Sequence, residues 1–224
     1  MDKGWKSVLR LDKNSAGRDF ACGDIHGCFD DLERELWKLR FDKAADRLFC
    51  VGDLIDRGPS SELVADYLNS PWFFSVMGNH ELMFLMANRD TPERHSYFHS
   101  HFLNGGEWAY GMPKQKYDAI QATVQKLPLV IRVGNAIVVH AALPAVESLG
   151  EIEKDPAPYT ETILWFRGRY PAVNVPGIER IYAGHSILER PERVGKYVNI
   201  DTGAFLRHWG ERGKLTVLEI GKDD

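Results

Sequence analysis

The sequence predicts an α/β fold in which two mixed β-sheets pack together and helices flank them. Short apolar runs alternate with amphipathic helical patterns over residues 20–87, which is typical of βαβ units around a parallel sheet. After Pro128, the two-residue turn Gly134-Asn135 joins two apolar runs and indicates an antiparallel hairpin. Several apolar runs are followed directly by Asp, Asn or His, so we expect metal-ligand side chains at strand ends.

The first third of the chain carries the clearest alternation of strand and helix. After Gly27, the residues Leu32, Leu36 and Leu39 recur at helical spacing and share one face, and early acidic residues suit the helix dipole. In sheets of this kind, ligands gather beyond the carboxyl ends of the strands. The predicted strands are 20–22, 47–51 and 73–77, and the predicted helices are 29–39, 60–68 and 80–87.

Beyond residue 87 the pattern changes. The apolar rhythm weakens over 88–126 and turn residues such as Thr91-Pro92 accumulate, so we predict a helical and loop insertion near the mouth of the site. The length is usual for one α/β domain, and we predict a single domain over 1–224 that includes this insertion. Further strands are predicted at 129–133, 136–139, 180–183, 197–200 and 215–220.

Composition excludes several classes of protein. The 224 residues are 44% hydrophobic, and 28 basic and 32 acidic side chains give a formal net charge of −4. The charges are interspersed, so we expect no nucleic-acid partner. The first residues are polar and no apolar stretch approaches the ~20 residues that span a bilayer, so we expect no membrane association and a cytoplasmic location. Cys22, Cys28 and Cys50 form an odd set, which makes a disulfide framework improbable. No feature indicates the oligomeric state.

Five segments in order carry metal-ligand side chains after apolar runs. The mixture of Asp, His and Asn suits Mn, Fe or Zn better than Ca or Mg, and no Cys lies among the candidates. A single Asp or Asn beside Gly is commonly a turn former or helix cap, but independent caps have no reason to recur at five strand ends. The segments are Gly23-Asp24-Ile25-His26-Gly27, Gly52-Asp53-Leu54-Ile55-Asp56-Arg57-Gly58, Gly78-Asn79-His80-Glu81, His140 and His185. We expect these strand ends to converge on one edge of a sheet.

These segments resemble the signature of the metallophosphoesterase superfamily, and in particular the lambda-type branch of the phosphoprotein phosphatase family. The resemblance extends from about Arg18 to Ile220 and includes smaller matches such as the segment 102–108 and the segment 163–167. It implies a calcineurin-like fold and two divalent metal ions per chain, with Mn expected first and Fe or Zn as alternatives. It also implies phosphoprotein or phosphopeptide substrates.

The resemblance further implies a ligand set. Metal one would be bound by Asp24, His26 and Asp53, and metal two by Asp53, Asn79, His140 and His185. A carboxylate has two oxygens, so Asp53 can bridge two cations about 3.5–4 Å apart. A water shared by both metals would have its pKa lowered from about 15.7 toward about 7, which makes the resulting hydroxide the expected nucleophile.

Catalytic and substrate-binding roles follow from the same resemblance. His80 is the expected general acid, and Asp56 is the carboxylate that orients it and raises its pKa. Arg57 and Arg167 are the expected phosphate clamps, since a guanidinium offers parallel donors to two oxygens, and Asn79 is also expected at the phosphate. Neighbouring Arg169 competes with Arg167 for the second clamp.

Two further features are interpreted without a catalytic role. His95, His99 and His101 lie in the irregular insertion with no carboxylate at suitable spacing, so we predict that they are solvated loop or rim residues. The segment Asp201-Thr202-Gly203-Ala204 is predicted to be a turn that shapes the wall of the site.

The leading functional hypothesis is hydrolysis of phosphate monoesters on protein serine or threonine, with tyrosine as a further candidate. The alternative is a symmetrical dinucleoside-tetraphosphate hydrolase, a related family that tends to lack the acid at Asp56 and to have Asp where this chain has Glu81. A third hypothesis is a metal-bound scaffold that has lost catalysis. The presence of His80, Asp56 and Arg57 argues against it.

Overall fold

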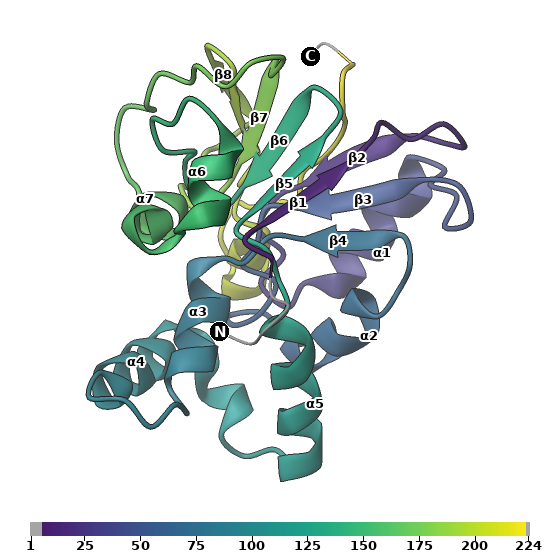
Figure 1. Cartoon of the computed structure of the whole chain (residues 1–224). Coiled ribbons are helices and arrows are strands. Elements are labelled where there is room, and N and C mark those ends of the chain that lie inside the picture. The colour runs from purple at the N-terminus through teal and green to yellow at the C-terminus, as the bar shows by residue number, and fades with distance from the viewer. Residues whose placement is uncertain (1–5, 223–224) are drawn as a thin grey trace.

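Two β-sheets form the centre of the molecule in the computed structural model, which describes residues 6–222 (Figure 1). The larger sheet has the order β1 (Val8–Leu11), β5 (Val130–Val133), β6 (Ala136–Val139), β7 (Arg180–Ala183), β9 (Tyr197–Asn199) and β8 (Glu192–Val194). The smaller sheet has the order β10 (Val217–Glu219), β2 (Asp19–Cys22), β3 (Arg47–Cys50) and β4 (Phe73–Ser75). In the larger sheet, β5 and β6 pair antiparallel, β8 and β9 pair antiparallel, and the other neighbours are parallel. In the smaller sheet, β2, β3 and β4 are parallel and β10 is antiparallel to β2.

Alternate residues of each strand face the two sides of its sheet, as the period of a strand requires. Phe49 and Val51 belong to a buried cluster that joins the two sheets, together with Ile131 and Val138 from the larger sheet. Burying one such side chain contributes about 1.5–3 kcal/mol. Leu48 and Cys50 belong to a second cluster with side chains of the helices. The sheets therefore pack face to face with helices outside, as predicted.

Helices cover the outer faces of both sheets (Figure 1). The smaller sheet is flanked by α1 (Phe29–Lys38) and α2 (Val64–Leu68), and a 3₁₀ turn at Ser61–Leu63 precedes α2. The larger sheet is flanked by α6 (Leu149–Lys154) and α7 (Thr160–Trp165), with 3₁₀ turns η4 (Ala157–Tyr159) and η5 (Ala204–Trp209) elsewhere in this half of the chain. Helix α3 (Asn79–Met86) begins at one of the predicted ligand segments.

The segment predicted as an insertion contains two α-helices and lies on the lower side of the molecule in Figure 1. Helix α4 (Arg94–His101) packs against α3, and α5 (Lys114–Val124) packs against α2. Between α4 and α5 lie a π-helical turn η2 (Phe102–Gly106) and a 3₁₀ turn η3 (Glu107–Ala109). Gly105 has φ +92°, and its Cα approaches the backbone of Arg57 so closely that a Cβ there would collide with it. The insertion segment therefore contacts the ligand segment that follows β3.

The predicted strands and helices of the first third are present, with ends that differ by a residue or two, except that the helix predicted at 60–68 is α-helical only over 64–68 and begins as a 3₁₀ turn. Among residues 6–222, the prediction had no counterpart for two strands and two α-helices, namely β1, β8, α6 and α7. Each is only three to six residues long, so its sequence carries little pattern. β1 is held by pairing with the distant strand β5, whereas β8 pairs with β9 across a short turn.

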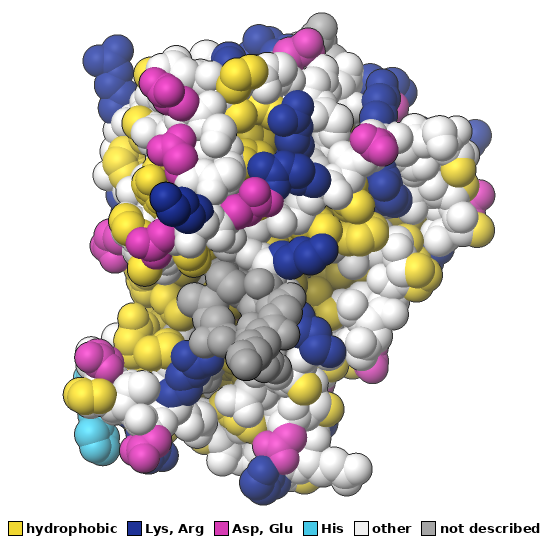
Figure 2. Space-filling model, viewed as in Figure 1, with side chains coloured by type: hydrophobic (Ala, Val, Ile, Leu, Met, Phe, Trp, Pro, Cys, Tyr) yellow, Lys and Arg dark blue, Asp and Glu magenta, His cyan; other side chains and the backbone are white. Residues whose placement is uncertain are grey.

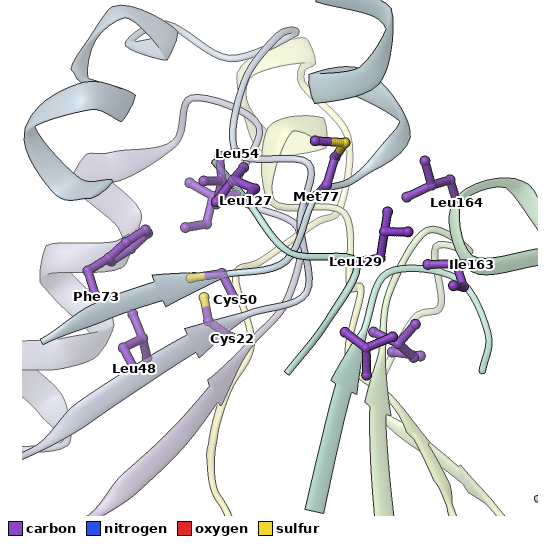
Figure 3. Close-up of a cluster of buried hydrophobic side chains, with 14 of the residues drawn as sticks. Cys22, Leu48, Cys50, Leu54, Phe73, Met77, Leu127, Leu129, Ile163 and Leu164 are labelled. Carbon is purple, nitrogen blue, oxygen red and sulfur yellow. The ribbon is translucent and has the colours of Figure 1, made fainter. Parts of the chain in front are cut away.

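The cysteines agree with the expectation that the chain has no disulfide framework. Cys22 and Cys50 are register partners on β2 and β3, and Figure 3 shows them side by side among apolar side chains. All three cysteines are buried and reduced. Basic, acidic and apolar side chains are intermixed on the face in Figure 2. Within residues 6–222, no helix is long and apolar enough to cross a membrane.

Candidate dinuclear metal site

The five ligand segments converge at the carboxyl ends of five strands. β2, β3 and β4 of the smaller sheet lead into Asp24, Asp53 and Asn79, whereas β6 and β7 of the larger sheet lead into His140 and His185. The expectation of one sheet edge is therefore wrong, because two sheets share the site. Packing the sheets face to face brings their carboxyl ends together, so that the site spans the seam between them.

Several residues of the site have a left-handed backbone conformation, with positive φ. Among residues 6–222, six non-glycine residues have positive φ, and five of them are predicted site residues. Such conformations cost free energy and tend to be retained where a functional site requires them. They turn the chain sharply just beyond the strands, so that successive side chains point into the site. The five are His26, Asp53, Asp56, Arg57 and His185.

Asp53 lies at the centre of the site. Its Oδ1 is 3.5 Å from Nε2 of His140, and its Oδ2 is 3.6 Å from Nε2 of His26. The two oxygens therefore face two different groups of nitrogen ligands. The surrounding histidines and Arg57 outweigh the effect of burial and lower the pKa of Asp53, so its carboxylate is ionised.

Two histidines present a lone pair toward Asp53. Nδ1 of His26 lies 2.9 Å from the carbonyl of Ile55, and Nδ1 of His140 lies 2.9 Å from the carbonyl of Val51. A carbonyl only accepts, so each Nδ1 carries the proton and each Nε2 is left as an acceptor in the neutral ring. Burial lowers the pKa of both imidazoles, which keeps them neutral. This tautomer is the one that binds a metal through Nε2.

His185 supplies the clearest indication of a cation-binding site. Its Nε2 is buried and has no hydrogen-bond partner. Burial, and then the proximity of His140, lower the pKa of His185 to about 3, so the nitrogen is unprotonated and carries a lone pair. Leaving a buried acceptor without a partner costs about 1–3 kcal/mol. A divalent cation would satisfy it.

Buried carboxylates that lie close together also indicate a cation-binding site. Burial and the neighbouring carboxylates of Asp201 and Asp53 raise the pKa of Asp24 well above its usual value. Burial also raises the pKa of Asp201 to about 6. The Asp24 carboxylate accepts from the backbone N–H of His185 at 3.1 Å, and a Cβ at Gly184 would collide with it. Bound cations would relieve this repulsion.

The residues present therefore fit a pair of divalent cations. Two groups of side chains have ligand atoms within 4.8 Å of one another, and Asp53 belongs to both: one contains His26 and His80, and the other His140 and His185. Asn79 lies beside the second group, with Oδ1 2.8 Å from Nε2 of His140.

His80 differs from the other histidines because a carboxylate holds it. Its Nδ1 lies 2.7 Å from Oδ2 of Asp56, and both side chains are buried. Burial lowers the pKa of His80, but the carboxylates of Asp53 and Asp56 outweigh burial and leave it raised. The pKa of Asp56 is about 2, since hydrogen bonds from His101 and His80 outweigh burial. This pair can hold a proton on His80 near the cation-binding group.

The insertion segment provides the other partners of Asp56. His101 Nε2 lies 3.0 Å from Oδ1 of Asp56, Trp108 Nε1 donates to the same oxygen at 2.7 Å, and His101 Nδ1 lies 2.7 Å from the hydroxyl of Tyr110. The prediction that His101 is a solvated rim residue is wrong: it is fully buried, whereas His95 and His99 are exposed. The carboxylate partner of His101 is 45 residues away, so no local spacing in the sequence could reveal it.

The two predicted arginine clamps differ in placement. The Arg57 guanidinium donates to Nε2 of His26 at 2.9 Å and stacks on Phe205, with Cζ 4.7 Å from the ring centroid. Arg167 is exposed, and its charge contributes to lowering the pKa of His140 and His185. Arg169 instead lines a neighbouring pocket of about 240 Å³.

Glu81 is a site residue to which the sequence analysis assigned no role. Its carboxylate is fully buried and accepts from the backbone N–H groups of Asp53 at 2.9 Å, Leu54 at 2.8 Å and Gly78 at 2.8 Å. It thereby ties the loop after β3 to the loop after β4 and positions Asp53. Two signals in the sequence were available: its place directly after Asn79-His80, and the difference at this position between the two candidate families.

A family model described as calcineurin-like phosphoesterase matches residues 20–200. The chain belongs to the calcineurin-like phosphoesterase family. The family and the fold class predicted from the sequence are thus confirmed for this phosphoesterase. The matched region runs from β2 to the end of β9 and contains all five ligand segments.

Relatives of this phosphoesterase include members of two named groups. It is 30% identical to serine/threonine-protein phosphatase 1 of Salmonella typhimurium over 220 residues, which covers 94% of this chain and 95% of that protein. It is 48% identical to a symmetrical bis(5'-nucleosyl)-tetraphosphatase of Dechloromonas aromatica, but only over 70 residues, 30% of this chain and 25% of that protein. The solved structure of a candidate diadenosine tetraphosphatase has a TM-score of 0.62 at 22% identity, covering 97% of this chain and 95% of that chain, which shows the shared fold.

Proposed function

We propose that the protein is a cytoplasmic, metal-dependent phosphatase that removes phosphate from serine and threonine residues of phosphoproteins. The observation that carries the proposal is the contact between a cation-binding group centred on Asp53 and the acid pair formed by His80 and Asp56, with His80 Nε2 3.9 Å from Oδ2 of Asp53. The protein phosphatase of Salmonella typhimurium, which matches over nearly the full length of both chains, supports the same substrate class.

The metal-binding roles are part of this proposal. Two divalent cations, Mn²⁺ in preference to Fe²⁺ or Zn²⁺, would supply the charge that lowers the pKa of a water molecule and neutralises phosphate oxygens. Asp53 would be the ligand common to both cations because its two oxygens face His26 and His140. The mixed oxygen and nitrogen donors suit borderline ions. Metal one would take Asp24, His26 and Asp53, and metal two Asp53, Asn79, His140 and His185.

His80 is proposed to protonate the leaving oxygen. A serine or threonine alkoxide is a poor leaving group, so its departure requires a proton donor near neutral pH. Cations bound at Asp53 would neutralise that carboxylate, so the positive charge on His80 would then depend on Asp56. Asp56 is suited to this task because it is ionised and holds Nδ1 at 2.7 Å, which leaves Nε2 as the donor.

Arg57 and Arg167 are proposed to bind the phosphate. The stacking of Arg57 on Phe205 limits the conformations of its long side chain, so less entropy is lost when the guanidinium binds phosphate oxygens. Arg167 is preferred to Arg169 as the second clamp because its charge acts on His140 and His185, whereas Arg169 lines the adjoining pocket. Asn79, whose Oδ1 lies 2.8 Å from Nε2 of His140, is proposed to complete the polar surface that faces the phosphate.

Hydrolysis of dinucleoside tetraphosphates is the second candidate function. It is favoured by the match to the Dechloromonas aromatica protein, which is higher in identity but covers only 30% of this chain. A nucleotide phosphate leaves readily without protonation, so that reaction gives no reason to retain the acid pair. The buried contact between His80 and Asp56 therefore argues for the phosphomonoesterase.

A direct substrate comparison tests the proposal. The Mn²⁺-loaded protein is assayed with phosphoserine, phosphothreonine and phosphotyrosine peptides and with diadenosine tetraphosphate, and the same assays are repeated after chelation. We expect the highest kcat/KM on phosphoserine or phosphothreonine peptides and loss of activity on chelation. Cleavage of the tetraphosphate into two diphosphates at about ten times the peptide efficiency would reassign the protein to the second function. Full activity in metal-stripped protein would refute both.

A further inference from the structure

Cys28, Asp31 and His208 form a second group of metal-ligand side chains outside the dinuclear site. Their ligand atoms all lie within 4.8 Å of one another. Cys28 precedes the first residue of α1, Asp31 lies in the first turn of that helix, and His208 lies in η5. The group thus joins two segments about 180 residues apart in the sequence.

The Asp31 carboxylate is only half satisfied. Its Oδ1 accepts hydrogen bonds from Arg34 and, at 3.1 Å, from Arg207. Its Oδ2 has no hydrogen-bond partner. Water cannot readily replace that partner, because the residue is 95% buried. Nε2 of His208 lies 3.5 Å from Oδ2, which is too long for a hydrogen bond. The unpartnered carboxylate oxygen thus lies within 4.8 Å of the His208 imidazole and of the Cys28 thiol, which itself donates to the carbonyl of His26 at 3.5 Å.

We propose that Cys28 Sγ, Asp31 Oδ2 and His208 Nε2 bind a third divalent cation of the zinc class. Sulfur, nitrogen and carboxylate oxygen together are a zinc ligand set, and three protein ligands leave one position of a tetrahedron for water. A thiolate and an imidazole on one tetrahedral zinc lie about 3.6 Å apart, so closing the group on a cation requires a movement of about 1 Å. His208 is partly exposed and can make that movement.

The neighbouring arginines do not exclude a cation. Both guanidiniums occupy Oδ1 and leave Oδ2 to the group. The side chains of Arg34 and Arg207 are 54% and 57% exposed, so solvent and salt screen their charges. A guanidinium on the second oxygen of a metal-bound carboxylate also orients that ligand, as partners beyond the metal ligands commonly do.

The proposed third cation site is connected to the dinuclear site through Phe205. Phe205 lies in the same 3₁₀ turn as His208, its ring centroid is 5.0 Å from that of His26, and it stacks on Arg57. A cation that ties η5 to the start of α1 would hold Phe205 against the proposed phosphate clamp. The proposed site therefore has a positioning role rather than a catalytic one.

Cobalt absorption tests the site without reference to activity. Co²⁺ is titrated into the full-length, metal-free protein, because a thiolate-to-cobalt charge-transfer band requires a cysteine ligand and the dinuclear site contains none. We expect the band to saturate at micromolar Co²⁺ and to be displaced by Zn²⁺. The variants Cys28→Ser and His208→Gln should lose it, whereas His95→Gln, which changes another exposed histidine, should keep it.

The Asp53→Asn variant separates this proposal from the dinuclear site. It should lose the cations that share Asp53 but keep the thiolate band. His208→Gln should show the converse, retaining two cations per chain in a metal count while losing the third. His208 is at the surface, so this variant should fold even if Cys28→Ser does not. A missing band in the unsubstituted protein, saturation only at millimolar Co²⁺, or an unchanged band in His208→Gln would overturn the proposal.

Discussion

His80 and His185 follow strands of the two different sheets, and both are buried within the site, yet their environments are opposite. His80 has a carboxylate at 2.7 Å and a raised pKa. His185 has no partner for its Nε2, and its pKa is lowered to about 3. At neutral pH the first environment favours a proton on the ring, and the second favours a free lone pair.

The comparison teaches that the group bound to the ring decides the role of a buried histidine. A carboxylate partner stabilises the imidazolium and makes a proton donor, whereas burial without a counter-charge leaves a neutral ligand. His26 and His140 resemble His185, because each directs its Nδ1 proton to a backbone carbonyl. The site thus separates into a metal-binding side and a proton-holding side, with Asp53 between them.

Replacing Asp53 should disrupt both the metal-binding side and the proton-holding side of the site. It should therefore have the largest effect. We expect Asp53→Ala to bind neither cation of the pair tightly and to have no measurable turnover, since it removes the ligand that both share. His26→Ala should mainly weaken metal affinity, so that high Mn²⁺ restores part of the activity. Metal titration followed by both metal content and p-nitrophenyl phosphate hydrolysis distinguishes the two. Equal behaviour of the variants would argue against a bridging Asp53.

His80→Asn should affect the proton-holding side alone. We expect metal content to be unchanged and kcat on phosphoserine peptides to fall by roughly 10²–10⁴-fold, the usual contribution of a general acid. The loss should be smaller for p-nitrophenyl phosphate, whose leaving group needs little protonation.

The pH profile provides a further check on His80. An acid must be protonated to act, so kcat on phosphoserine peptides should fall as pH rises through the raised pKa of His80. This limb should disappear in His80→Asn. If His80→Asn lost the same factor in kcat on phosphoserine peptides and on p-nitrophenyl phosphate, His80 would act by electrostatic stabilisation instead of proton donation.

Substituting the arginines should act mainly on phosphate binding. Arg57→Ala should raise KM and lower kcat, together reducing kcat/KM by roughly 10²–10³-fold, because the guanidinium is proposed to hold both the bound phosphate and the more charged transition state. Arg167→Ala should have a milder effect of the same kind and weaken inhibition by inorganic phosphate. Arg169→Ala is the matched control, and a larger loss in this variant would transfer the second clamp to Arg169.

His101 and Trp108 should have the smallest effect, acting through Asp56. Both donate to its Oδ1, so His101→Gln and Trp108→Phe should lower kcat on phosphoserine peptides by roughly 10–100-fold, the usual cost of losing a partner one step from the reacting groups. As with His80→Asn, the loss should be smaller on p-nitrophenyl phosphate. His99→Gln, at an exposed position of the same helix, is the control. Equal losses on both substrates would indicate general destabilisation of the insertion.

The sequence by itself determined the ligand types and their positions at strand ends. An apolar run followed by Gly-Asp or Gly-Asn is a local pattern: the run specifies a buried strand, and the glycine permits the turn that follows. His140 and His185 were recognisable for the same reason, since each follows an apolar run. The pairing of His80 with Asp56 was also predicted from the sequence, because the motifs that contain them identify a family.

Tertiary structure decided which side chains meet. His101 reaches Asp56 across 45 residues, and Trp108 reaches it across 52, through a segment with no clear period in its sequence. Glu81 acquires its role from backbone groups of a loop 28 residues away, and the division of the ligands between two sheets depends on how those sheets pack. Hydrophobic patterning encodes elements one at a time, whereas these contacts arise only when distant elements bury their apolar faces against each other.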